Sequence, residues 1–225
     1  MQIKELKIYS TKIKDQADFY SEVLGLNVIK RSHKNIFLKI GKSILNIEFR
    51  PKTTPYHFAI NIPANKENEA LEWLKSKIEI LTDANNEIQD FDSWNARAIY
   101  FYDKDKNIVE LIARKNLNNS SDQKFDTKQF LEISEIGLPT LDIQKVFTQL
   151  TRLTGIEIFD GEFERFCAIG DENGLFIGIN KSIKNWFPTN DKAISSEFII
   201  KLIEKGNEYH IEYKNEEIKA IGKIA

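Results

Sequence analysis

The order of hydrophobic and polar positions changes its period several times in the first fifty residues. Apolar side chains recur at spacings of three and four over residues 13–24, which predicts a helix that ends at Gly25. Shorter apolar runs on either side of this segment predict strands. These strands are expected at residues 3–8, 26–28, 36–40 and 43–49. The first part of the chain is therefore predicted to form a β-α-β-β-β unit.

The same order of patterns recurs along the chain. A shift of 52 residues places His57 on Glu5, and a shift of 130 residues places Glu135 on Glu5. A further copy begins at Ala193, but it is too short to hold the helix before its final hairpin. Internal repeats of this kind indicate one supersecondary unit used several times. We therefore expect three units and a truncated fourth.

A polar segment rich in Asn, Ser and Asp separates the second unit from the third, as a linker does. The expected organisation is a complete two-unit barrel over residues 1–116, a linker over 117–126, and a degenerate half over 127–225. Strands and helices mixed in this way place the chain in the α+β class.

Three motifs on this repeat resemble the vicinal oxygen chelate superfamily, which includes glyoxalase I, bleomycin-resistance proteins and extradiol dioxygenases. They are Phe19-Tyr20 through Leu24-Gly25-Leu26, His57-Phe58-Ala59, and the segment from Phe101 to Leu111. The resemblance covers residues 1–115 well and 130–180 more loosely. The turn at 103–107 reads Asp-Lys-Asp-Lys-Asn instead of the usual Asp-Pro-Asp-Gly-Asn. The resemblance implies tandem βαβββ units, a glyoxalase-like open barrel and a degenerate second barrel.

The resemblance also implies a metal site. In that superfamily a divalent ion lies inside the barrel and is held from the first and last strands of each unit. Carried over to this chain, those positions are Glu5, where the family more often has His, and Glu48, His57 and Glu110. The implied ion is Mn, Fe, Ni or Zn, because carboxylates and an imidazole suit hard and borderline cations. Glu110 and Glu48 are the candidates for moving a proton as catalytic base and acid.

Each of these four residues also has a purely structural interpretation. Glu5 lies in a run rich in Lys and Glu that is typical of a solvated strand face, and Glu48 is near Arg50, with which it could pair. His57 begins an apolar strand, where hydrogen-bonded histidines are common. Glu110 has apolar neighbours on both sides. Because a buried carboxylate is costly unless it is paired or bound to metal, Glu110 is the strongest candidate.

The expected function is that of a metal-dependent lyase, isomerase or ring-cleaving dioxygenase that acts on a small molecule with adjacent oxygens. The alternative is a metal-free binding protein that sequesters its ligand, as bleomycin-resistance proteins do. In a third interpretation, the degenerate half mediates formation of a homodimer. The segment Trp186-Phe187-Pro188 is an apolar wall that suits a plug, a ligand pocket or an interface.

Composition excludes other partners. The chain of 225 residues has 32 Lys and Arg against 34 Asp and Glu, a net charge of −2, so it lacks the basic field of a nucleic-acid-binding protein. No apolar stretch reaches the roughly 20 residues that cross a membrane. The single cysteine, Cys167, fits a reducing compartment. A cytoplasmic protein with a small-molecule substrate is expected.

Overall fold

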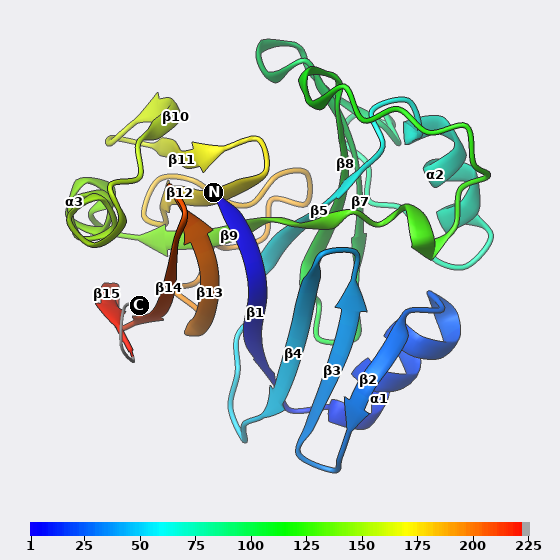
Figure 1. The fold of residues 1–225 in the computed structure, drawn as a ribbon, viewed down its shortest axis with the longest axis horizontal. Coiled ribbons are helices and arrows are strands. Elements are labelled where there is room, and N and C mark those ends of the chain that lie inside the picture. Colours follow the sequence, from blue (N-terminus) through cyan, green and yellow to red (C-terminus); the bar gives the residue numbers. More distant parts are fainter. Residues whose placement is uncertain (222–225) are drawn as a thin grey trace.

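The computed structural model describes residues 1–221, whose strands form two curved sheets (Figure 1). The seven-stranded sheet has the order β15-β14-β13-β1-β4-β3-β2. Its strands are β1 (Gln2–Ser10), β2 (Asn27–Arg31), β3 (Asn35–Ile40), β4 (Ser43–Phe49), β13 (Phe198–Glu204), β14 (Asn207–Lys214) and β15 (Glu217–Ala220). In Figure 1, β1 (dark blue) lies beside β13 (orange), so this sheet joins segments from opposite ends of the sequence.

The eight-stranded sheet is built from the middle of the chain and has the order β10-β11-β12-β9-β5-β8-β7-β6. Its strands are β5 (His57–Ile62), β6 (Gln89–Phe91), β7 (Ala96–Tyr102), β8 (Ile108–Arg114), β9 (Glu132–Thr140), β10 (Ile158–Glu162), β11 (Phe166–Asp171) and β12 (Gly174–Asn180). Its two halves meet where β5 pairs antiparallel with β9. This sheet therefore contains two complete βαβββ strand sets, the second unit and the third.

The units pair differently from the sequence-based expectation. The first unit does not join the second in one barrel over residues 1–116; it joins β13–β15, the truncated fourth unit. Hydrophobic periodicity predicts which face of each strand is buried. It does not predict which two units pair through their first strands. The end of the predicted fourth unit, residues 222–225, lies outside the described residues.

Three helices connect these strands and cover the sheets. They are α1 (Ile13–Asp18), which continues as a π-helical turn over Phe19–Val23, α2 (Glu67–Lys75) and α3 (Ile143–Thr154). The α3 helix begins at Asp142, whose side chain accepts a hydrogen bond from the Lys145 amide at 2.8 Å, and it ends at Gly155 with a φ of 72°. Both are ordinary helix caps. Short 3₁₀ turns lie at Asp92–Trp94, Lys115–Leu117 and Thr127–Gln129.

Apolar residues of both sheets and of all three helices form the main core, and a second, smaller cluster includes Ala59, Tyr100 and Trp186. The expected α+β fold of repeated βαβββ units is confirmed. Within residues 1–221, no helix combines the length and the hydrophobicity needed to cross a bilayer.

Candidate metal centre

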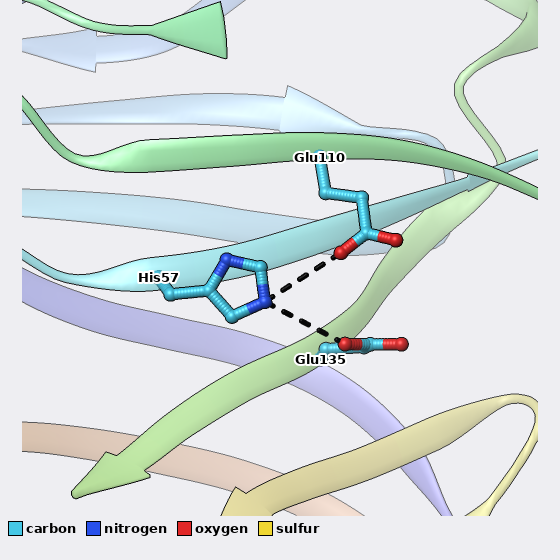
Figure 2. Close-up of side chains that lie close together, drawn as sticks. All are labelled: His57, Glu110 and Glu135. Atoms are coloured by element: carbon cyan, nitrogen blue, oxygen red, sulfur yellow. Dashed lines mark ion pairs between the residues drawn. The ribbon is translucent and has the colours of Figure 1, made fainter. Parts of the chain in front are cut away.

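The middle of the eight-stranded sheet brings three ionisable side chains together on one face. Strand β5 lies between β8 and β9, and Ala59 on β5 pairs with Glu110 on one side and Glu135 on the other. His57 is two residues before Ala59 and therefore points to the same face. Because Ala59 has only a methyl group, both carboxylates can extend over it toward the imidazole. Figure 2 shows the three side chains converging from three neighbouring strands.

The distances suit a shared cation. His57 Nε2 lies 3.5 Å from Glu110 Oε2 and 3.7 Å from Glu135 Oε2. One atom of each residue lies within 4.8 Å of the others, and the exposed fractions are 6% for His57, 2% for Glu110 and 3% for Glu135. Ligand atoms about 2 Å from a common transition-metal ion are separated from each other by about 3 to 4 Å.

The hydrogen bond on the far side of the imidazole fixes which nitrogen faces the carboxylates. His57 Nδ1 lies 3.2 Å from the carbonyl oxygen of Ile108. A carbonyl only accepts, so Nδ1 donates this hydrogen bond and Nε2 is the ring nitrogen that faces Glu110 and Glu135. When Nε2 and both carboxylates are deprotonated, three acceptors converge in this buried site. A divalent cation satisfies all three, so this donor set fits a metal ion.

Two neighbouring side chains hold the carboxylates in place. The fully buried guanidinium of Arg114 donates to Glu135 Oε1 and, at 3.3 Å, to the side-chain oxygen of Asn61. Tyr100 pairs with Glu110 across β7 and β8, so its side chain lies beside the Glu110 carboxylate. Such second contacts orient metal ligands and tune their basicity.

Glu110 is the residue whose protonation depends most on this environment. Burial raises the pKa of Glu110 well above its usual range, and the neighbouring carboxylate of Glu135 raises it further. The charge of Arg114 and the neighbouring hydroxyl of Tyr100 act in the opposite direction. The result favours a proton on Glu110 when no cation is bound.

The structure does not assemble the four predicted ligands in one place. His57 and Glu110 lie together, whereas Glu5 on β1 and Glu48 on β4 belong to the seven-stranded sheet. Both of these glutamates have lysine partners. Glu5 accepts from Lys201 Nζ at 2.7 Å, and Glu48 accepts from Lys7 Nζ at 3.0 Å.

The third member of the centre, Glu135, comes from the half that the sequence analysis considered degenerate. Its signal was the repeat itself, because Glu135 and His57 both occupy the position of Glu5 in their units. In the third unit, the position that corresponds to Glu110 does not carry a metal-binding side chain. Ala59 pairs with Glu110 in the second unit, and the equivalent Gly137, two residues after Glu135 on β9, pairs with Ile177. Three protein ligands leave room for other ligands at the ion, as catalytic metal sites do.

The three residues line a cavity of about 360 Å³. Six of its other lining residues are aromatic: Phe91, Trp94, Tyr100, Phe166, Trp186 and Phe187. The Trp186 ring is buried, with its centroid 4.9 Å from that of His57. The Trp186-Phe187 segment is thus a wall of this cavity.

Gly137 makes room for the Trp186 wall. A Cβ atom at this position would lie 2.6 Å from Trp186 Cη2. We expect Gly137→Ala to displace the indole, to shift its fluorescence emission and to lower the free energy of unfolding by about 1 to 3 kcal/mol. Urea unfolding and emission spectra test this expectation. In a Trp186→Ala background, the same Gly137→Ala substitution should cost little, and an equal cost in both backgrounds would contradict the steric explanation.

Comparison with known proteins complements this geometry. No protein-family model matches the sequence, and no curated protein matches it. Among solved structures, a putative dioxygenase from Bacillus subtilis subsp. subtilis str. 168 superposes with a TM-score of 0.61 at 13% identity, over 82% of this chain and 65% of that protein. The chain has the vicinal oxygen chelate fold. The part of the Bacillus protein that this chain matches is 65% of its length.

Smaller solved structures align with about half of the chain. A lactoylglutathione lyase from Agrobacterium tumefaciens aligns with a TM-score of 0.43 at 17% identity, over 48% of this chain and 90% of that one. Another is a variant of the fosfomycin resistance protein FosX from Listeria monocytogenes, complexed with Mn(II) and 1S,2S-dihydroxypropylphosphonic acid. It aligns with a TM-score of 0.40 at 21% identity, over 51% of this chain and 90% of that one.

Proposed function

We propose that this chain is a metal-dependent enzyme whose substrate is a small molecule with two adjacent oxygen atoms. The observation that carries the proposal is the buried group of His57, Glu110 and Glu135 in the wall of a cavity that six aromatic residues also line. The candidate reactions are those of lyases, isomerases and ring-cleaving dioxygenases.

The three residues would hold the ion, with Mn, Fe(II), Ni and Zn as the candidates for an imidazole and two carboxylates. Bound there, the ion would supply Lewis acidity to the substrate oxygens. Glu110 is the ligand that binds a proton most readily when it is not on the ion, and it is therefore the residue suited to take up and return a proton. The aromatic walls would exclude water and hold a flat substrate.

The aromatic lining also favours a second candidate function. Six aromatic side chains surround the cavity, an arrangement that can bind a planar molecule without chemistry. In this alternative the chain sequesters its ligand, and no metal is needed. The two functions differ in whether the protein takes up a divalent ion.

Metal content tests the proposal. Protein purified without an affinity tag or chelators is expected to contain about one equivalent of a divalent ion, measured by elemental mass spectrometry, as expected for one buried three-ligand site. Glu135→Gln is expected to weaken binding of that ion by about 100-fold, because it replaces a carboxylate ligand with a neutral amide. Titration of the chelator-treated protein measures this affinity.

Glu5→Gln is the matched control, because Glu5 occupies the position of Glu135 in its own unit but lies in the other sheet. Its metal affinity should equal that of the wild type. If Glu5→Gln loses metal and Glu135→Gln retains it, the proposed centre is wrong. If the protein binds none of the four ions, the sequestering function is favoured.

A further inference from the structure

A second hollow opens outside the aromatic cavity. It has a volume of about 610 Å³ and shares Lys184, Trp186 and Phe187 with the cavity of the metal centre. Arg165 also lines this hollow. A molecule that reaches from the metal centre toward this outer hollow would therefore pass the Lys184 side chain.

Two positive charges line the outer hollow, on the half-buried Lys184 at the junction and on the exposed Arg165. Among residues 1–221, neither Lys184 nor Arg165 forms an ion pair within 4 Å. Most other charged side chains around the cavity form an ion pair or accept a hydrogen bond. Lys184 is half-buried, and its Nζ atom lies 5.8 Å from the centre of the Phe166 ring. Burial lowers the pKa of Lys184, and the positive charge of Arg165 lowers it further.

Among the residues that the structure describes, none of the four acidic residues that line these two hollows forms an ion pair with Lys184 or Arg165 within 4 Å; they are Glu110, Glu135, Asp160 and Asp83. Glu110 and Glu135 belong to the metal centre. Asp160 lines the inner cavity, where its carboxylate accepts hydrogen bonds from Trp94 Nε1 at 2.5 Å and from the Gly161 amide at 2.8 Å. Asp83 lines the outer hollow and is exposed. A half-buried cation next to another cation is stabilised when an anion binds.

We propose that the ligand of this cavity is a planar aromatic molecule with an anionic group at its distal end, which Lys184 binds with support from Arg165. The aromatic part would lie against Trp94 and Trp186 in the inner cavity. The proposal rests on the proposed function in one respect: the end of the ligand away from its anionic group is placed at the metal centre. It makes Lys184 a specificity-determining residue.

The test compares anionic ligands with neutral ones on chelator-treated protein, so that a metal ion cannot itself attract the anion. The probes are benzoate, phenylacetate, 3-phenylpropionate and phenyl phosphate, each beside the uncharged alcohol or methyl ester of the same skeleton, with binding measured by calorimetry. At least one anion is expected to bind about tenfold or more tightly than its neutral partner. The carboxylate and phosphate probes distinguish the kind of anion.

Lys184→Met is expected to abolish this preference, and Lys184→Gln should do the same. Lys192→Met is the control, because Lys192 is an exposed lysine of the same connecting segment that lines neither hollow. Equal binding of anionic and neutral probes to the wild type, or an unchanged preference in both Lys184 variants, would overturn the proposal. Metal uptake of Lys184→Met should equal that of the wild type, so failure of the metal centre and failure of the anion site give different results.

Discussion

Replacing Arg114 by methionine is expected to destabilise the metal-free protein by about 3 to 5 kcal/mol, the cost of breaking a buried ion pair from one side. The guanidinium is fully buried and neutralises Glu135. Without it, the carboxylate of Glu135 would lack its positive partner in a site with almost no solvent. Urea unfolding in the presence of a chelator measures this cost.

Arg97→Met is the matched control for this prediction. Arg97 pairs with Asp90 at 3.1 Å and with Glu67 at 3.6 Å, but its side chain is 38% exposed. Its loss should cost no more than about 1 kcal/mol. Adding Glu135→Gln to Arg114→Met should recover part of the lost stability. If Arg114→Met alone costs no more than Arg97→Met, the buried pair does not have the role assigned to it.

Glu110→Gln is expected to stabilise the metal-free protein by an amount that grows with pH. Burial and Glu135 raise the pKa of Glu110 above its ordinary value of 4.5. Above pH 4.5 the unfolded chain loses this proton first while the folded protein keeps it, so the wild type loses stability as the pH rises toward the folded-state pKa. Within that window, the advantage of the glutamine variant should grow by about 1.4 kcal/mol per pH unit.

Unfolding of both proteins at a series of pH values tests this expectation. Well below pH 4.5 the carboxyl group is protonated in both states, so the pH-dependent part of the difference should vanish there. Excess divalent ion should stabilise the wild type and leave Glu110→Gln nearly unchanged, because binding to the folded state alone adds stability. A difference that is constant across pH would contradict the raised pKa of Glu110.

The sequence predicted the units well because their signals are local. Periodicity, the Gly25 stop and the Asp142 cap each depend on neighbours within one helical turn or one strand. The pairing of units depends on contacts between residues far apart in sequence. Glu5 meets Lys201 only because β1 lies beside β13, and no local pattern contains that information.

The candidate centre could be predicted only in part, because some of its contacts lie within one unit and others join two units. His57 and Glu110 belong to one unit, and the parallel pairing of β5 with β8 brings them together. Glu135 joins them from the next unit across the antiparallel edge between β5 and β9. The repeat identified Glu135 as the equivalent of His57, but only the sheet order shows that the two face each other.

The strand order also has a consequence for the sequence of events during synthesis. Every strand of the eight-stranded sheet has been translated once Asn180 has left the ribosome, whereas β1 must wait for β13, which begins at Phe198. Until then, the first strand pairs only with β4 and has one open edge, the kind of edge that invites wrong partners. The sheet that carries the metal centre can thus form while the earliest-made strand of the chain is still without its second neighbour.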